Sequence, residues 1–373
     1  MRPRAKHDSP LAGAPFERAF VRPSSGPLRY NGPMRIEVEG RDLSGFPATE
    51  DDIFYCYRLV LGREPDQNGF DNYSAVIKTR HTSITDLFRM FLTSAEFKNR
   101  NLLPKEDGAE PVLAELPSFR LYVSPSDWAV GKPILESRVH EPHVTGILKH
   151  ILAPGMTLLD IGANIGYFTM LARSIVGQTG KVWAFEPNPL NCTLLHLSLA
   201  ANSFQDVEIF PFALADSPRL FVYDAQGSNG TITPYGGDPA ALSARTVIRS
   251  VVLDDVLRPD RCDVLKIDVE GAEFLALQGG VNLIRTHHPV IFTEFSPPAL
   301  RNVSGVSGEQ YLQFLFSEGY RVNVINATSA LVECGDDSGK VMKHFENAHV
   351  SHIDLLAIPP GFDRNTLPFT QAR

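Results

Sequence analysis

The sequence predicts an α/β fold, in which helices cover both faces of a mostly parallel sheet and a small all-α unit precedes that sheet. Two patterns support this prediction. From residue 118 onward, short apolar runs alternate with amphipathic stretches, which is typical of successive strands and helices in an α/β sheet. Residues 50–103 instead repeat their apolar side chains near helical spacing. A chain of 373 residues has room for both units.

Composition excludes several classes of protein. With 43% hydrophobic and 21% charged residues, the chain has the composition of a globular protein with a sizeable core. Its net charge of -8 argues against nucleic acid as a partner, because neutralising phosphates needs clustered Lys and Arg. No stretch reaches the ~18–20 apolar residues that span a bilayer, and the N-terminus lacks the apolar region of a signal peptide. We therefore expect a cytoplasmic protein without a transmembrane segment.

The cysteines indicate a reducing compartment. Cys56, Cys192, Cys262 and Cys334 are far apart and form no Cys-x-x-Cys pair. A zinc site or a disulfide framework is therefore not expected, and four buried or indifferent thiols are.

The N-terminal part of the chain divides into a tail and a helical unit. Residues 1–48 carry repeated Pro and Gly without a helical or strand period, which predicts a disordered tail. Apolar residues then recur at helical spacing, and the segments end at polar or Gly-containing turns. Helices are predicted from Glu50 to the breaker at Gly62, over 69–78 and over 83–91, with a turn at 94–97. We interpret residues 50–103 as a helical accessory domain, joined to the next domain by a linker over 104–117.

This helical unit resembles a known family. The segment YRLVLGREPDQNGFDNY, followed by FLTSAEF, resembles a small helical domain of unknown function that is often attached to bacterial glycosyltransferases, methyltransferases and surface-layer proteins. The resemblance implies an accessory or docking role with a protein partner, and it favours glycans as substrates of the attached enzyme. It names no chemistry.

Residues 118–360 are predicted to form the sheet-containing domain, followed by a C-terminal tail over 361–373. Its strands are expected at 157–161, 181–185, 207–211, 263–267, 290–293, 320–325 and 353–358. Its helices are expected at 166–176, 188–201, 272–278 and 307–318.

A Gly-rich turn joins the first of these strands to its helix. It reads Asp160-Ile161-Gly162-Ala163-Asn164-Ile165-Gly166. Because ligands of open α/β sheets bind at the carboxyl ends of the strands, this turn is the expected cofactor site. Gly162 and Gly166 would let the backbone approach the ligand closely. Glu186 ends the next strand, where such folds place a carboxylate against the two ribose hydroxyls.

Asp160 distinguishes two classes of cofactor. A pyrophosphate would be repelled by this acid, whereas the sulfonium and ammonium of S-adenosylmethionine would be attracted. The third glycine of the dinucleotide pattern G-x-G-x-x-G is also missing. The residues therefore favour S-adenosylmethionine over a nicotinamide dinucleotide.

Residues 119–359 resemble the FkbM family of S-adenosylmethionine-dependent methyltransferases. The matching pieces, in order, are SFRLYVSPSDWAVG, HEPHVTGILKHILAPG, LLDIGANIGYFT, AFEPNP, PFALAD, VLDDVL, VLKIDVEGAEFLALQGG and HIDLLAIP. The resemblance implies the class I methyltransferase (Rossmann-like) fold, a seven-stranded sheet whose last strand is antiparallel. It also implies O-methylation of sugars, polyketides or related secondary metabolites.

The resemblance further implies cofactor-binding residues. These are Asp160, Gly162, Asn164 and Gly166 in the turn, Glu186 at the ribose, and Ala213 to Asp216 at the adenine. The loop between Gly227 and Ala244 is this chain's own, so the resemblance implies nothing about the acceptor there.

Charged residues alternate with apolar ones at the end of the predicted strand 263–267. Lys266, Asp268 and Glu270 share one face and Leu265, Ile267 and Val269 the other. Charges are rarely buried unpaired in a central strand, so we place them at its carboxyl end, facing the cofactor. We hypothesise that Asp268, Lys266 and Glu270, together with Glu273, shape the acceptor site. Asp268 is the first candidate for a base, although it could equally position the acceptor or pair with Lys266.

Other acids and histidines are weaker candidates. Asp268, Glu270 or Glu294 could offer oxygen ligands to magnesium, but the resemblance requires no metal and we expect none. His140, Glu141 and His143 precede the helix that leads into the cofactor strand; His140 and His143 are interpreted as lid residues, and the whole run could simply be the start of a helix.

The sequence thus predicts an S-adenosylmethionine-dependent O-methyltransferase that acts on a small molecule or a glycan, with polysaccharide biosynthesis as its setting. Two alternatives stay open. One is a docking protein for glycan assembly with an inactive methyltransferase domain, and the other is a nicotinamide-dependent oxidoreductase.

Overall fold

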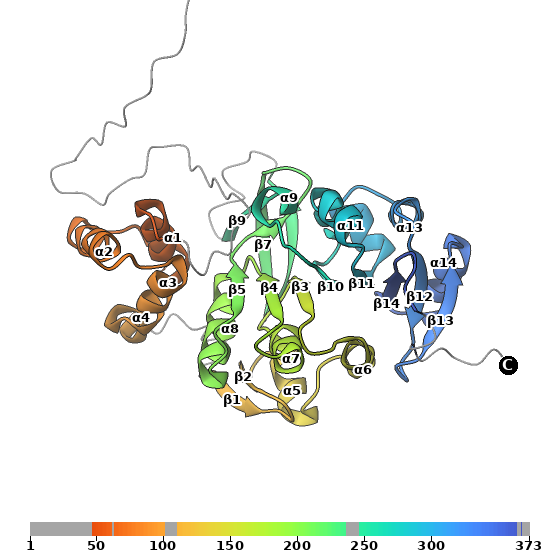
Figure 1. The fold of residues 1–373 in the computed structure, drawn as a ribbon, viewed down its shortest axis with the longest axis horizontal. Helices are drawn as coiled ribbons and strands as arrows, with labels where there is room; N and C mark the ends of the chain where they lie inside the picture. The colour runs from red at the N-terminus through yellow and green to blue at the C-terminus, as the bar shows by residue number, and fades with distance from the viewer. Residues whose placement is uncertain (1–46, 62, 101–109, 236–245, 364–366, 368–373) are drawn as a thin grey trace, which may run out of the picture.

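The computed structural model describes residues 47–61, 63–100, 110–235, 246–363 and 367. Residues 1–46 of the predicted tail, 104–109 of the predicted linker and most of the predicted C-terminal tail lie outside these residues. Figure 1 shows the described elements arranged from the helical unit at one end, through a central sheet, to a hairpin at the other.

Four helices form the N-terminal unit: α1 (Glu50–Val60), α2 (Gln67–Arg80), α3 (Ile84–Thr93) and α4 (Ala95–Arg100). The three predicted helices are present, but the predicted turn at 94–97 was wrong, because the Ser94 hydroxyl accepts a hydrogen bond from Phe97 N and starts α4 there. The unit has its own core, in which Ile53, Leu87 and Phe91 are fully buried.

The central sheet has eight strands in the order β13-β12-β14-β11-β10-β3-β4-β5. Their bounds are β3 (Thr157–Ile161), β4 (Lys181–Phe185), β5 (Val207–Phe210), β10 (Val264–Ile267), β11 (Val290–Phe295), β12 (Arg321–Ile325), β13 (Leu331–Gly335) and β14 (Ile353–Ile358). Each of the seven predicted strands is present within a few residues. From β11 to β5 the neighbours are parallel, and β14, the last strand of the chain, is antiparallel to β11.

The sheet is mixed and has one more strand than predicted. β13 pairs antiparallel with β12 across a tight turn in which Asn326 Oδ1 accepts from the backbone N of Thr328 and Ala330. The pairs β11 with β14, β14 with β12 and β12 with β13 are therefore all antiparallel. A short edge strand that follows a polar turn has too few residues for its alternation to be distinguished from a loop.

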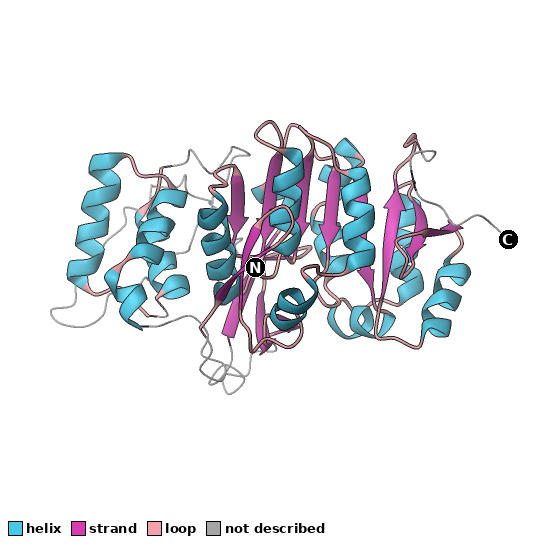
Figure 2. Cartoon of the chain, turned by 90° about the horizontal axis from the view of Figure 1, so that it is seen from below, coloured by secondary structure: helices cyan, strands magenta, loops and turns pink. Residues whose placement is uncertain are grey.

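Helices cover both faces of the sheet, as predicted (Figure 2). On one face lie α6 (Pro142–Ile151), α7 (Tyr167–Val176) and α8 (Pro189–Asn202), whose apolar side chains pack with Leu158 and Val182. On the other face lie α10 (Glu273–Gly279), α11 (Val281–His287) and α13 (Gly308–Ser317), which pack with Leu159 and Trp183. Alternate residues of the central strands thus enter different cores.

Further elements lie outside the predicted pattern. β1 (Val112–Glu115) pairs with β2 (Arg120–Val123), so the second unit begins inside the predicted linker, before Ser118. A second sheet has the order β6-β9-β7-β8, formed by β6 (Ala213–Leu214), β7 (Leu220–Gln226), β8 (Asn229–Pro234) and β9 (Thr246–Val251). The remaining helices are α5 (Gly131–Ser137), α9 (Leu253–Val256), α12 (Pro297–Val303) and α14 (Ser338–Ala348).

Two other expectations concern cysteines and membranes. All four cysteines are free and buried, as predicted. Within the described parts of the chain, no helix has both the length and the apolar character needed to cross a bilayer.

Candidate active site

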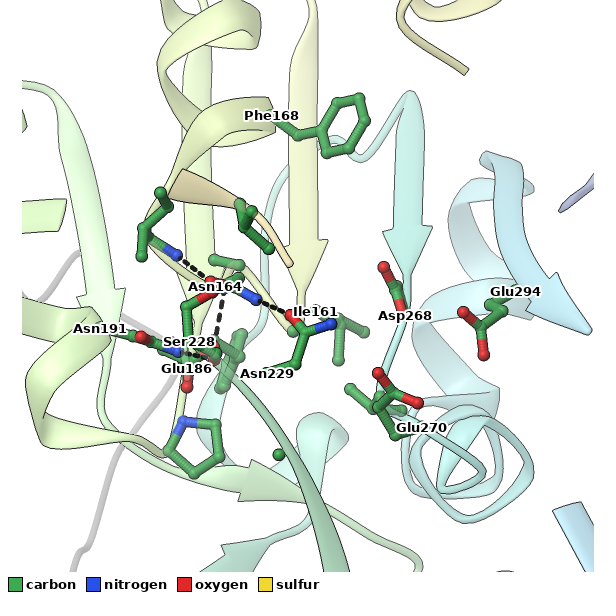
Figure 3. Close-up of a pocket in the computed structure, with 18 of the residues that line it drawn as sticks. Ile161, Asn164, Phe168, Glu186, Asn191, Ser228, Asn229, Asp268, Glu270 and Glu294 are labelled. Atoms are coloured by element: carbon green, nitrogen blue, oxygen red, sulfur yellow. Dashed lines mark hydrogen bonds between the residues drawn. The ribbon is translucent and has the colours of Figure 1, made fainter. Parts of the chain in front are cut away.

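A cavity of about 360 Å³ opens at the carboxyl ends of β3, β4 and β10. This volume falls in the range of small-molecule pockets, ~300–1,000 Å³. Figure 3 shows its two sides: Glu186 and Asn191 lie on one, and the carboxylates of Asp268, Glu270 and Glu294 lie on the other. We call these last three residues the acidic wall.

The Gly-rich turn forms part of the cavity through Gly162, Ala163, Asn164 and Ile165. At two glycines of this turn, neighbouring protein atoms leave no room for a side chain. Gly162 has φ +80° and a Cβ there would lie 1.8 Å from the backbone oxygen of Asp268, while a Cβ on Gly166 would meet Leu195 Cγ at 2.7 Å. Gly162 lines the cavity and Gly166 does not, and close approach of a ligand to either glycine stays a prediction.

Glu186 is held in place by the turn. Its Oε2 accepts a hydrogen bond from Asn164 N (2.7 Å) and its Oε1 accepts one from Asn188 N (2.8 Å). The side chain is 5% exposed, and burial raises the pKa of Glu186 to about 7. Carboxylate oxygens have further lone pairs beyond these two bonds, so Glu186 can still accept from hydroxyls in the cavity.

Asp160 lies beneath the cavity and does not line it. It is fully buried, its Oδ2 accepts a hydrogen bond from the Thr169 hydroxyl (2.6 Å), and its Oδ1 has no partner among the described residues. Burial raises the pKa of this carboxyl, although Lys266, opposite it in the register of β3 and β10, favours its ionised form. Asp160, which the sequence places at the cofactor, thus lies next to the cavity without lining it.

The segment after β5 supplies an apolar part of the cavity. Phe212, Ala213 and Leu214 line it, as does Ile232 from β8. Asp216, predicted at the adenine, instead pairs with Arg219 three residues on and does not line the cavity. An apolar slot of this kind fits a flat aromatic base.

Lys266 forms an ion pair with Asp268 of the acidic wall, with Nζ 3.2 Å from Oδ2. Lys266 is only 5% exposed, and its ammonium lies 4.7 Å from the centre of the Phe168 ring. Burial opposes its charge, but Asp268, Asp160 and Glu141 outweigh that effect and raise the pKa of Lys266. The lysine therefore stays charged and turns one oxygen of Asp268 toward itself.

The two glutamates after Asp268 differ in role. Glu270 lines the cavity, adopts a left-handed backbone conformation with φ +53°, and has its pKa raised by burial and by Asp268. Glu273 is 1% exposed and accepts hydrogen bonds from Val269 N and Gly271 N. The sequence analysis expected Glu273 at the acceptor site. In the structure it instead accepts hydrogen bonds from the backbone of the turn that precedes α10.

Glu294 and His352 close the acidic side. Glu294 Oε2 lies 3.5 Å from His352 Nδ1, and burial together with the charge of Asp268 raises the pKa of Glu294. His352 lines the cavity with a side chain that is 44% exposed.

The predicted lid residues separate into two groups. His140 and Glu141 line the cavity, and burial together with the charge of Lys266 lowers the pKa of His140 to about 4. His143 lies outside it and pairs with Asp354 (Nε2 to Oδ2 2.6 Å), which raises the pKa of His143.

Sequence reasoning missed the hairpin between β7 and β8. Ser228, Asn229 and Gly230 line the cavity, and Asn229 Oδ1 accepts from Asn164 Nδ2 (2.8 Å). This stretch was interpreted as part of a loop over 227–244, of which residues 236–245 lie outside the described residues. The sequence pointed to this loop as a place where the acceptor is determined, but it did not predict the two strands; Phe212 and His352 were missed because no local pattern indicates which distant segment reaches a cavity.

Metal ligation was also considered. Across the described parts of the chain, no three or more His, Cys, Asp or Glu side chains are grouped so that they could hold a metal ion.

Comparison with known proteins finds similarity to methyltransferases. Residues 160–322 match the model of the Methyltransferase FkbM domain, a shorter range than the resemblance over 119–359. A curated relative, the methyltransferase sdnD of Sordaria araneosa, is 29% identical; the match covers 33% of this chain and 59% of that protein. The chain thus spans less than two thirds of this relative. Both findings show similarity to methyltransferases, and the family model that matches is that of the FkbM domain.

Solved structures are similar only at a distance. Methyltransferase FkbM of Methylobacillus flagellatus KT is 13% identical with a TM-score of 0.34, covering 86% of this chain and 63% of its own. An S-adenosylmethionine-dependent O-methyltransferase of Thermotoga maritima is 14% identical with a TM-score of 0.33, covering 62% and 72%. The resemblance of the N-terminal helices to a helical domain of unknown function stays a prediction.

Proposed function

We propose that the chain binds S-adenosylmethionine in the cavity and methylates a hydroxyl oxygen of a sugar, in a glycan or a secondary metabolite. One observation carries this proposal. One side of the cavity has the buried carboxylate of Glu186 and the apolar slot, and the other side has the acidic wall. Lys266, which also lines the cavity, is already paired with Asp268 of that wall. That division suits a nucleoside that carries a positive charge.

The residues fit this cofactor part by part. Glu186 would accept hydrogen bonds from the two ribose hydroxyls, and Asn164 orients Glu186 from the turn. The adenine would lie against Phe212, Ala213 and Leu214. The acidic wall would attract the sulfonium and the ammonium, and it would repel a pyrophosphate. Asp160 and Gly166 contribute by shaping the turn.

When bound, S-adenosylmethionine supplies an electrophilic methyl group. The acceptor hydroxyl is a poor nucleophile and needs a group that orients it and takes up its proton. Asp268 is exposed to the cavity with 28% of its side chain accessible, and its Oδ2 is engaged by Lys266. Its other oxygen is available to orient the hydroxyl, and Glu270 stands beside it.

The setting of this reaction is also a proposal. The resemblance of the helical unit to domains attached to glycan-assembly enzymes favours a glycan acceptor and polysaccharide biosynthesis, an argument from association alone. The polar, carboxylate-rich side of the cavity is consistent with a polyhydroxylated, uncharged acceptor.

Two measurements test the proposal. Titration calorimetry with S-adenosylhomocysteine should show binding, and titration with a nicotinamide dinucleotide should not; the reverse result would overturn it in favour of an oxidoreductase. Labelled S-adenosylmethionine, incubated with the protein and an extract of the source cells, should yield a labelled product whose methyl group is on oxygen. Cofactor binding without any labelled product would support an inactive docking protein.

A further inference from the structure

The N-terminal helical unit contacts the sheet-containing unit through two aromatic pairs. The Phe88 ring lies 4.4 Å from the His196 ring on α8, and the Tyr55 ring lies 5.9 Å from the Phe212 ring with its edge toward it. Figure 1 shows α1 and α3 on the side of the sheet where β5, α8 and β9 lie. Both pairs connect the same two units, but only one of them includes a residue that lines the cavity.

Phe212 belongs to the cavity and His196 does not. Phe212 lines the cavity directly before Ala213 and Leu214, in the link between β5 and β6. This link is short, and Phe212 N donates to Phe210 O (2.8 Å), so the ring has little backbone freedom. The same ring thus touches the cavity and Tyr55.

Tyr55 offers Phe212 an apolar surface from outside. Its hydroxyl is buried and has no hydrogen-bond partner in the described parts of the chain. Burial raises the pKa of Tyr55 to about 12, so the phenol is neutral. What Tyr55 contributes to this contact is therefore its ring.

The position of Tyr55 is fixed by its helix. α1 begins with a capping box in which Asp52 Oδ2 accepts from Thr49 N (2.7 Å), and the neighbours Phe54 and Cys56 are buried in the core of the helical unit. Tyr55 points out of that core, toward the second unit. An edge-on aromatic contact of this kind adds an attraction beyond that of the apolar area it buries.

We propose that Tyr55 is a positioning residue for the cofactor: it holds the Phe212 ring in place, so that the helical unit completes the adenine side of the cavity. The identity of the ligand rests on the proposed function, whereas the coupling between the two units rests on the contacts. The helical unit would then set cofactor affinity in addition to any docking role.

Titration calorimetry of the full chain with S-adenosylhomocysteine tests this. Tyr55→Ala should weaken binding by on the order of tenfold, which corresponds to about 1.4 kcal/mol, because the Phe212 ring then loses the aromatic contact that holds its outer side and keeps only its packing against the core beneath the sheet. Tyr55→Phe should bind like the wild type, since it keeps the ring and removes only a hydroxyl that has no partner in the described parts of the chain.

Phe88→Ala provides the matched control. It removes the other aromatic contact between the units, whose partner His196 lies away from the cavity, so it should change affinity by less than twofold. Equal weakening in Phe88→Ala and Tyr55→Ala would overturn the specific role of Tyr55, as would wild-type affinity in Tyr55→Ala. If Tyr55→Ala does not fold, Tyr55→Leu serves instead, with the same expectation. Absence of binding in the wild type would instead count against the proposed function.

Discussion

Glu186 illustrates how a single side chain is prepared for a ligand. Two backbone N–H groups, of Asn164 and Asn188, hold its carboxylate at the edge of the cavity. Its burial nevertheless raises its pKa to about 7, so near neutral pH the carboxyl is partly protonated. A bound ribose would stabilise the ionised form, because hydroxyls donate to carboxylates.

This linkage predicts pH-dependent binding. The ionised form of Glu186 binds the ribose hydroxyls, and protonation of its carboxyl competes with this binding. Affinity for S-adenosylhomocysteine should therefore fall as pH is lowered through 7, by on the order of tenfold between pH 8 and pH 6. Calorimetry at the two pH values measures it. Glu186→Gln should bind more weakly at both values without that slope. An unchanged slope in this variant would assign the titration to another group, such as Glu141.

At Asp268 the ion pair with Lys266 separates two functions of one carboxylate. The oxygen bound to Lys266 fixes the orientation of the side chain, and the other faces the acceptor in our proposal. Asp268→Asn should therefore lower turnover at saturating S-adenosylmethionine by ~100-fold or more, the contribution of a general base, in addition to any loss of S-adenosylhomocysteine affinity that follows from the lost charge. Wild-type turnover in this variant, measured with labelled S-adenosylmethionine, would reject the role of Asp268.

At the scale of elements, the turn between β3 and α7 depends on its contact with the strand end of β10. Gly162 has φ +80° and its missing Cβ leaves room for the backbone oxygen of Asp268. The cofactor turn and the proposed catalytic segment are thus in direct contact. This contact would be broken by any side chain at position 162.

Gly162→Ala should abolish detectable binding of S-adenosylhomocysteine and destabilise the fold by more than the ~1–3 kcal/mol of left-handed strain alone. Gly177→Ala is the control: Gly177 also has a positive φ of +68°, at the end of α7, but a Cβ there would meet nothing within 4 Å. That variant should show the strain in urea unfolding and keep its binding. Normal binding in Gly162→Ala would contradict the close approach.

In the helical unit, Arg63 joins the turn between α1 and α2 to helix α4. The sequence linked these two segments only through the family that they resemble. Its guanidinium makes two parallel bonds to Glu96 of α4, at 2.6 and 2.7 Å, and it lies 4.7 Å from the Tyr57 ring. Asp66, in the same turn, accepts from Gly69 N and caps α2. Arg63 and Asp66 therefore connect helices of the unit as well as lying between α1 and α2.

Arg63→Lys should destabilise the helical unit by about 1 kcal/mol, because a lysine lacks the planar fork. Hydrogen exchange of amides in α1 to α4 measures this. The exposed pair of Arg58 and Glu64 offers a control, since Arg58→Lys should change protection by less than about 0.5 kcal/mol. Equal effects of both substitutions would show that the bidentate geometry is not important.

For the whole molecule, cofactor binding should increase the free energy of unfolding. A ligand that binds only the folded state at a concentration of about 100 Kd adds ~2.7 kcal/mol to the free energy of unfolding. S-adenosylhomocysteine should therefore raise the midpoint temperature of thermal unfolding. A nicotinamide dinucleotide at equal concentration should not change that temperature. A shift with the dinucleotide alone would contradict the proposed cofactor.

Much of this architecture was predictable because local patterns specify it. Central strands such as β3 and β4 are mostly apolar runs that are followed by Gly162 and Glu186, so their limits were predicted to the residue. The Gly turn and Glu186 could be found because a strand, a turn and the next strand end lie near one another in the chain. The edge strand β13 and the second sheet were missed, since their short strands carry no periodic pattern that distinguishes them from loops.

What the residues do in the cavity was decided by long-range packing. The sequence indicated that Asp160, Gly166 and Asp216 belong near a cofactor, but burial placed Asp160 beneath the cavity and local contacts turned Gly166 and Asp216 away from it. Conversely, Phe212 and Asn229 reach the cavity only because segments far apart in the chain meet there. Periodicity records which face of an element is apolar, whereas the neighbours of that face depend on how the elements pack.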